Sequence, residues 1–492
     1  MKIFVWYFLP LLPLSFISLG CSKFLKESPK SLVTIDNYYK TEQDAVSSVN
    51  SIYSYLNSTS TGSTAGVYHS TFWVAMGLAS EELLNNQYGA PQFDQLANFT
   101  VSPTNSAIRE IWAMHYKTIT IANIAVSRIP FINMNTELRA RLLGEAKYLR
   151  ALMYFNMVRM FGKIPLLIDE KIPLYPQHAE TSAIYQQILQ DLTEAITVLP
   201  KSYPAGNGKG RATWGAAKSL LGEVYLTMSN WEQAAATLKE VIDSKEYALW
   251  DDFADVFKLS SRNGKEAVFS VGFGDAGGAI SFWEVGQFQV RLLPPDLSAE
   301  NVQNAQGWQV PTLYLFNSFD PNDRRRTVTF ITSIKNKDGS YKEIRPYIQK
   351  YWDRAAEPKG NASSNDFPVI RYADVLLSYA EAENELNRTN NALAYLNMIR
   401  KRARFNGSLY QNILPDYSGL TQQQIRDAIL KERMFEFVGE GKRWFDLARA
   451  KKLESQVPLA KPGVIPAVKS YLFPIPQYEI DLNKNLIQNN GY

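Results

Sequence analysis

The stretch TQQQIRDAILKERMFEFVGEGKRWFDLAR, residues 421–449, decides the fold of this chain. Thr421 is followed three residues later by Gln424, the spacing of a capping box, in which two side chains satisfy backbone donors that a helix start leaves unpaired. We therefore predict a helix that begins after Thr421 and carries an apolar stripe. The two glycines at positions 439 and 441 predict a break before the aromatic residues that follow.

Three glutamates recur one helical turn apart on one face of this predicted helix, next to its apolar stripe: Glu432, Glu436 and Glu440. Carboxylates this close to a core need cationic partners, because an unpaired buried charge is costly. We expect the nearby basic residues to supply them, namely Arg433, Lys442 and Arg443.

Two separated segments, residues 221–241 and 379–399, share the spacing of the tetratricopeptide repeat. In that pattern small residues let two antiparallel helices approach, and large residues fill the space between them. Because the two units are far apart in the sequence, we interpret residues 245–367 as an insertion on a helical scaffold. The insertion has strand-like runs at 266–271, 327–334 and 341–349, separated by loops rich in glycine, proline and aromatic residues. The predicted fold is mostly α, a tetratricopeptide-like superhelix with one irregular insertion that carries short strands.

Length and composition narrow the possible classes of protein. The chain has 492 residues, of which 46% are hydrophobic and 13% aromatic, enough for a large continuous core. Its formal net charge of +4 is too small for a nucleic-acid-binding protein of this size.

Residues 1–20 have the features of a secretion signal, with one lysine and a short hydrophobic run that is broken by two prolines. Cys21 follows directly and is the one cysteine in the sequence, so an intramolecular disulfide is not possible. Its position resembles that of the lipid-acceptor cysteine of bacterial lipoproteins. We predict a signal peptide at 1–20, a lipid-anchored tether at 21–40 and a single domain at 41–492.

Candidate ligand-binding residues come from two regions that combine aromatic rings with amides and a guanidinium. Flat rings stack on the apolar face of a sugar, and amide or guanidinium groups bind its hydroxyls. We predict residues 57–106 to be mainly long loops that expose aromatic rings. The candidates are Trp73, Asn86, Tyr88, Trp283, Gln289, Arg291 and Trp308. Trp283 and Trp308 are better candidates than Trp112, Trp214, Trp231 and Trp444, which lie in segments with helical periodicity.

Catalytic and metal sites receive little support from the sequence. The three histidines, His69, His115 and His178, have no metal-ligand spacing and no accompanying nucleophile motif. A glycoside hydrolase needs two nearby carboxylates, and Glu81-Glu82 and the set Glu381, Glu383 and Glu385 are the obvious choices. We interpret the first pair as a solvated helix start and the second set as a helix face. We therefore predict no catalytic residue, no metal site and no cofactor.

The motif E-R-x-x-E-F-x-x-E-G-x-R-W-F-D-L-x-R within residues 432–449 resembles the C-terminal signature of the SusD/RagB family of outer-membrane nutrient-binding lipoproteins. Residues 144–166, 210–226, 370–382 and 471–492 resemble other segments of that family, in the same order. The resemblance implies a protein at the cell exterior that binds a glycan or oligosaccharide and delivers it to a TonB-dependent (SusC-like) outer-membrane transporter. Two alternatives are a surface glycoside hydrolase, which would have close carboxylates in a cleft, and a protein-binding repeat scaffold, which would have an open groove without a platform of rings.

Overall fold

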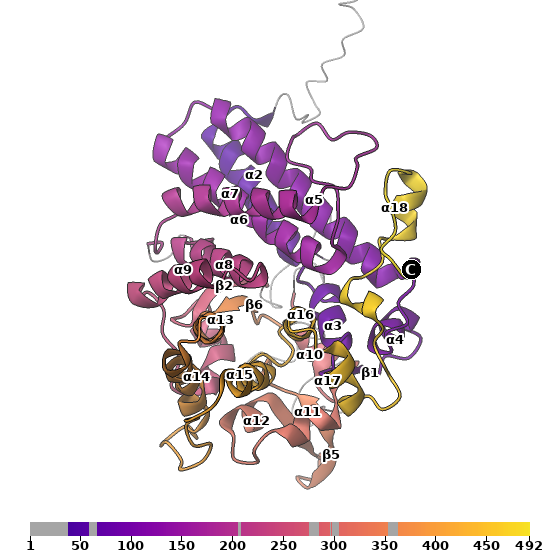
Figure 1. Ribbon diagram of the computed structural model, residues 1–492, viewed down its shortest axis with the longest axis vertical. Helices are drawn as coiled ribbons and strands as arrows, with labels where there is room; N and C mark the ends of the chain where they lie inside the picture. Colours follow the sequence, from indigo (N-terminus) through magenta and orange to yellow (C-terminus); the bar gives the residue numbers. More distant parts are fainter. Residues whose placement is uncertain are drawn as a thin grey trace, which may run out of the picture.

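The computed structural model describes residues 38–58, 66–204, 208–274, 285–295, 297, 305–352 and 363–492 (Figure 1). The predicted signal peptide, Cys21 and most of the tether lie outside these ranges. Within them, no helix combines the length and the hydrophobicity needed to cross a membrane.

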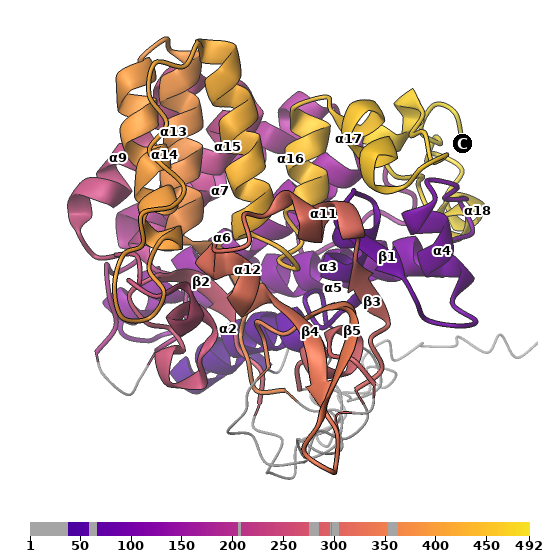
Figure 2. The same ribbon diagram turned by 90° about the horizontal axis from the view of Figure 1, so that it is seen from below.

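A stack of antiparallel helices forms the scaffold, as the helical periodicity predicts (Figures 1 and 2). Neighbouring helices pack in the order α5, α6, α7, and the pairs α8–α9 and α13–α14 continue the stack. The bounds are α2 (Glu42–Asn57), α5 (Ser106–Arg128), α6 (Thr136–Phe161), α7 (Thr181–Val198), α8 (Trp214–Thr227), α9 (Trp231–Ser244), α13 (Tyr372–Glu385), α14 (Thr389–Ala403) and α15 (Gln422–Glu436).

The two segments with tetratricopeptide spacing form the helix pairs α8–α9 and α13–α14, and helix α13 packs directly against α9 and α8. Gly222 shows why the small residues are needed: a Cβ atom at this position would lie 2.5 Å from the side chain of Leu238 on the partner helix. The two units are therefore separated in sequence but adjacent in space. The chain between them leaves the stack and returns to it.

The inserted segment contains the strands β2 (Ala267–Val271), β4 (Phe330–Lys335) and β5 (Tyr341–Ile348), close to the predicted runs. Strand β2 pairs with β6 (Phe367–Arg371), and β4 pairs with β5, all antiparallel. The run predicted at 327–334 begins as helix α12 (Arg324–Thr329) instead, because the side chain of Asp323 accepts a hydrogen bond from the backbone of Arg325 and caps a helix there.

Shorter elements complete the chain. They are α3 (Thr71–Leu78), β1 (Leu83–Asn85), α4 (Pro91–Ala97), η1 (Ile129–Phe131), η2 (Phe253–Phe257), η3 (Leu259–Ser261), α10 (Phe288–Leu292), β3 (Gln309–Pro311), α11 (Leu313–Ser318), α16 (Arg443–Arg449), α17 (Leu453–Ala460), η6 (Val468–Tyr471) and α18 (Gln477–Leu482).

The C-terminal stretch forms helix α15 with the predicted capping box at Thr421 and Gln424. The predicted break is also present, because Gly439 and Gly441 both adopt positive φ angles between α15 and α16. Gly441 packs against Trp73, and a Cβ atom there would lie 3.0 Å from the Trp73 Cβ.

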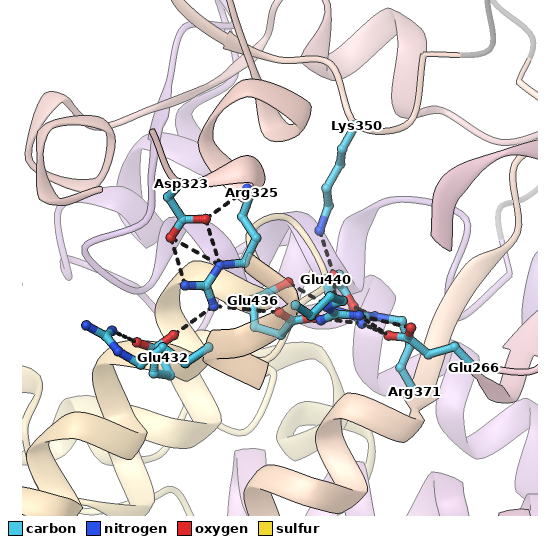
Figure 3. A network of polar contacts seen from close by, with 10 residues as sticks. Glu266, Asp323, Arg325, Lys350, Arg371, Glu432, Glu436 and Glu440 are labelled. Carbon is cyan, nitrogen blue, oxygen red and sulfur yellow. Dashed lines mark hydrogen bonds and ion pairs between the residues drawn. The ribbon is translucent and has the colours of Figure 1, made fainter. Parts of the chain in front are cut away.

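The three glutamates of this stretch are fully buried in a network of ion pairs that joins α15 to the insertion (Figure 3). Arg371 donates to Glu436 at 2.8 Å and to Glu440 at 2.8 Å, and Lys350 donates to Glu440 at 2.6 Å. Glu432 binds Arg325 at 2.8 Å and Arg400 at 2.7 Å. These pairs supply the cations that buried carboxylates need.

Our prediction of the cationic partners was wrong. Arg433 binds Asp374 and Asp446, Lys442 binds Asp374, and Arg443 binds Glu81. The three basic residues therefore pair with carboxylates other than the three glutamates, and the glutamates pair with cations that lie outside this stretch.

Candidate functional site

Where the structure describes it, the segment predicted to be mainly long loops contains helices α3 and α4, and residues 66–83 are buried. Residues 71–78 form helix α3, and every one of them is buried. Trp73 is fully buried, stacks on Phe288 with ring centroids 5.3 Å apart and donates its indole N–H to the carbonyl of His69. Our prediction of Trp73 as a ligand-binding residue is therefore corrected: its ring fills the core and offers no face to a ligand.

A short antiparallel pairing brings the two candidate regions together (Figure 2). Leu83 pairs with Pro311 and Asn85 with Gln309, so strand β1 lies beside strand β3. The pairing continues one residue further, because the backbone of Asn86 donates to the carbonyl of Trp308 at 2.7 Å. Asn86, Tyr88 and Trp308, predicted from separate parts of the sequence, thus come from adjoining backbone.

Gly307 fixes the approach of Trp308 to this surface. It has a positive φ of 56°, and a Cβ atom there would lie 2.4 Å from the ring of Tyr347. A side chain at this position would displace the strand, and the carbonyl of Gly307 accepts a hydrogen bond from the Asn86 amide at 3.3 Å.

Arg291 lies beneath the surface and connects its parts. Its guanidinium carbon is 5.3 Å from the centre of the Trp308 ring and 5.6 Å from that of Phe93, and it donates to Gln309 at 3.3 Å. Burial lowers the pKa of Arg291 to about 10, and the charge of Glu110 opposes the shift, so the guanidinium stays protonated at neutral pH. It forms no ion pair with any described carboxylate.

Several buried polar atoms around this point have no hydrogen-bond partner among the described residues. They are Nε of Arg291, Nε2 of Gln309 and Oε1 of Gln87. Buried polar groups are normally paired, so unpaired groups grouped together favour a ligand or water as their partner. Beside them, the side chain of Tyr88 is fully exposed. We call the surface formed by Asn86, Gln87, Tyr88, Arg291, Trp308 and Gln309 the ring-and-amide face.

The remaining candidates do not join this face by any described contact. Gln289 is buried on helix α10, and no described hydrogen bond links it to the other candidates. Trp283 lies outside the described residues. Gln309 was not predicted, since a strand of three residues gives no periodic signal, and it could be found only through its pairing with Asn85. Gln87 lies between the predicted residues Asn86 and Tyr88 in the same polar, aromatic-rich region.

Lys461 holds both ends of the segment that carries Asn86 and Tyr88. Its ammonium group donates to the carbonyl of Leu78 at 2.6 Å and to that of Ala97 at 3.2 Å, the last residues of α3 and α4. Burial lowers the pKa of Lys461 to about 7. Lys461 therefore joins the start of the loop between these helices to the far end of α4, while Tyr88 near the loop tip is exposed to solvent.

The carboxylate pairs considered for hydrolysis are engaged in structural contacts. Glu81 and Glu82 are buried, not solvated as we predicted; Glu81 binds Arg443, and Glu82 accepts a hydrogen bond from the backbone of Gly439. Burial raises the pKa of Glu82 to about 7. On helix α13, each of the three glutamates has an arginine partner: Glu381 binds Arg449, Glu383 binds Arg388 and Glu385 binds Arg426. Across the described ranges, no group of three or more histidine, cysteine, aspartate or glutamate side chains is arranged to hold a metal ion.

Solved structures share this architecture. A laminarin-binding SusD-like protein has a TM-score of 0.76 and 26% identity, covering 92% of this chain and 100% of that one. A SusD superfamily protein from Parabacteroides distasonis has a TM-score of 0.78 and 24% identity over 92% of this chain and 99% of its own length.

Sequence comparisons give the same assignment. The model of the SusD family matches residues 326–492, and a second model, described as "Starch-binding associating with outer membrane", matches residues 23–226. SusD-like protein P2 from Formosa agariphila is 31% identical over 96% of this chain and 97% of its own length. The starch-binding protein SusD from Bacteroides thetaiotaomicron is 23% identical over 87% and 86% of the two chains. With family models matching residues 23–226 and 326–492, and a relative that is 31% identical over 96% of this chain, the chain belongs to the SusD family.

Proposed function

We propose that this protein binds a glycan or oligosaccharide at the cell surface, using the ring-and-amide face, and does not cleave it. The observation that carries the proposal is the grouping of unpaired buried polar atoms next to the exposed ring of Tyr88 and the half-buried ring of Trp308. A sugar has groups that suit both features of this face. Its hydroxyls pair with amides and guanidinium groups, and its C–H faces stack on rings. The laminarin-binding relative supports a glycan as the class of ligand.

A panel of neutral and acidic polysaccharides, tested by affinity electrophoresis and then by calorimetry, tests this proposal. We expect at least one polysaccharide to bind, and we expect the double variant Tyr88→Ala, Trp308→Ala to lose that binding. Binding that survives in the double variant would place the ligand elsewhere. Reducing ends that accumulate at enzymatic rates during incubation with the bound polysaccharide would show that the protein is a hydrolase.

The proposal includes a lipid anchor at Cys21 and delivery of the ligand to a TonB-dependent outer-membrane transporter. A protein anchored in one leaflet cannot move a bound oligosaccharide across the membrane, so it needs a channel as partner. The tether between Cys21 and helix α2 would keep the domain attached while it moves over that channel. The family model's description, which includes association with the outer membrane, supports this location.

Extraction of the native membrane in a mild detergent, followed by pull-down through a C-terminal tag, tests the partner. We expect a much larger β-barrel protein to be recovered in near-equal amount. Recovery of the tagged chain without a barrel in several mild detergents would count against delivery to a transporter. It would not affect the glycan-binding proposal, which the polysaccharide panel tests separately.

A further inference from the structure

A cavity lies on the helical scaffold and shares no residue with the ring-and-amide face. It has a volume of about 320 Å³ and is lined by residues of the connection from α7 to α8 and of the beginning of strand β2. Its size is at the lower end of the range for small-molecule sites, roughly 300–1,000 Å³. The residues of its wall that matter here are Lys201, Tyr203, Lys209, Arg211, Tyr247 and Lys265.

The wall carries an excess of positive charge. Arg211 is neutralised by the buried carboxylate of Glu145, at 2.8 Å. The three lysines form no ion pair within the part of the chain that the structure describes, and Glu246 is the single carboxylate among the described lining residues. Three lysines against one glutamate leave an excess of two positive charges among these lining residues, and this excess favours an anionic ligand.

Two of the lysines are held over aromatic rings instead of carboxylates. The ammonium group of Lys265 lies 4.6 Å from the centre of the Trp250 ring, and that of Lys201 lies 5.5 Å from the Trp214 ring. A cation over an aromatic face is held in place but keeps its full charge. These lysines are therefore positioned without being neutralised.

The cavity also has a rigid, partly apolar wall. The hydroxyl of Tyr203 donates to the carbonyl of Ala212 at 2.8 Å, and the hydroxyls of Tyr247 and Thr213 lie 2.9 Å apart. Both hydroxyls are fixed by these bonds, and both tyrosines line the cavity beside the lysines. Rings together with cations suit a ligand that has both a ring face and an acidic group.

We propose that this cavity binds a sugar unit that carries an acidic group, either a carboxylate or a sulfate ester, as a second saccharide site. The anionic part of the proposal rests on the lining of the cavity, and the saccharide part rests on the proposed function. A protein with both sites would hold an acidic polysaccharide at two separate points, which increases the overall affinity through effective concentration.

Ligand-observed NMR titrations of the purified protein test the site with four probes. Glucuronate and glucose 6-sulfate are the two acidic sugars. Glucose is the uncharged control, and acetate has a carboxylate but no sugar ring. We expect at least one of the two acidic sugars to bind more tightly than both glucose and acetate. We expect added salt to weaken the binding of that sugar. Equal affinity for the acidic sugar and glucose would overturn the role of the lysines, and equal affinity for the acidic sugar and acetate would overturn the saccharide assignment. The absence of binding by both acidic sugars would overturn the proposal as a whole.

The double variant Lys209→Gln, Lys265→Gln tests whether binding occurs at this cavity. Both lysines are exposed, so we expect an unchanged melting temperature, and we expect the affinity for the acidic sugar to fall about fivefold or more. The matched control Lys163→Gln, Lys484→Gln removes the same net charge at exposed lysines elsewhere and should bind as the wild type does. Tyr88→Ala should also leave this binding intact, which separates the cavity from the ring-and-amide face. An equal loss in the two lysine double variants, or a loss in Tyr88→Ala, would contradict the proposal.

Discussion

Trp73 and Tyr88 lie on one short segment, yet the indole is fully buried and the phenol ring is fully exposed. The difference comes from their neighbours: Trp73 belongs to a helix that is apolar on all sides, whereas Tyr88 precedes Gly89, which adopts a positive φ of 70° at the loop tip. An exposed ring contributes little to the free energy of folding, so the exposure of Tyr88 favours a role in binding.

Replacing Tyr88 by alanine should weaken glycan binding without loss of stability. Because the ring makes no buried contact in the free protein, we expect an unchanged melting temperature, and a loss of about 1–3 kcal/mol of binding free energy if the ring stacks on the sugar. Titration calorimetry and a melting curve on the same preparation measure the two quantities. A lower melting temperature with unchanged affinity would make Tyr88 a structural residue.

Replacing Trp73 by alanine should have the opposite effect. The change removes a core ring that contacts Phe288 and Gly441, so we expect the free energy of unfolding to fall by about 3–5 kcal/mol. Urea denaturation measures it. A variant that unfolds at the wild-type urea concentration but no longer binds glycan would show that our correction of Trp73 is itself wrong.

Helix α15 is the element in which packing and charge depend most strongly on each other. Glu436 is fully buried among Arg402, Arg371 and Arg325, and these charges lower its pKa to about 2, against the desolvation that would raise it. A carboxylate with a depressed pKa stabilises the folded state above its unfolded pKa, near 4.5, and loses this contribution as the pH falls toward 2.

The variant Glu436→Gln should therefore be less stable than the wild type at neutral pH, by about 3–5 kcal/mol, because it leaves buried arginines without a full partner. We expect the difference to stay constant from pH 7 to about 5 and to shrink between pH 4.5 and 2, as the wild-type carboxylate takes up its proton. Urea denaturation midpoints at several pH values test this. A difference that is constant down to pH 2.5 would contradict the pKa assignment. The exposed residue Asp427 on the same helix supplies the control. The variant Asp427→Asn should change neither the stability at neutral pH nor its dependence on pH appreciably.

The elements that could be predicted from the sequence are those with a repeating pattern. Helices α2, α9 and α14 have one polar and one apolar face. Helices α8 and α13 follow the tetratricopeptide spacing, although α13 is buried on nearly all sides, and the capping box at Thr421 marks the start of α15 directly. Helix α3 could not be predicted in this way, because a helix buried on all sides has no periodic signal and its flanking serines and glycines resemble a loop.

The candidate site was predictable only in part. Asn86, Tyr88, Arg291 and Trp308 were found from their composition, and the contact between them depends on the pairing of β1 with β3, two strands of three residues each. The partners of the buried glutamates were missed for a related reason: Arg371 and Glu436 are brought together by the fold and not by their spacing on one helix.

At the scale of the whole molecule, the proposed anchor at Cys21 would determine where the domain is located. We expect Cys21→Ala to release the protein from the membrane fraction and to abolish incorporation of labelled fatty acid, since this is the one cysteine of the chain. Cell fractionation and metabolic labelling measure the two outcomes. The variant Ser22→Ala is the matched control and should remain lipidated. Labelling of the cysteine variant at the level of the wild type would rule out this anchor.

The buried network also constrains the order of events during secretion. For a chain that is exported N-terminus first, as proposed here, Arg325, Lys350 and Arg371 emerge well before Glu432, Glu436 and Glu440. These cations cannot be buried at low cost until their last partners arrive, so the insertion cannot close onto the scaffold while the C-terminal segment is still inside the export channel. If export proceeds as proposed, the part of the domain that this network joins would close only after the chain has emerged beyond residue 440, and a chain that stops short of residue 440 would leave Lys350 and Arg371 without Glu440 as a partner.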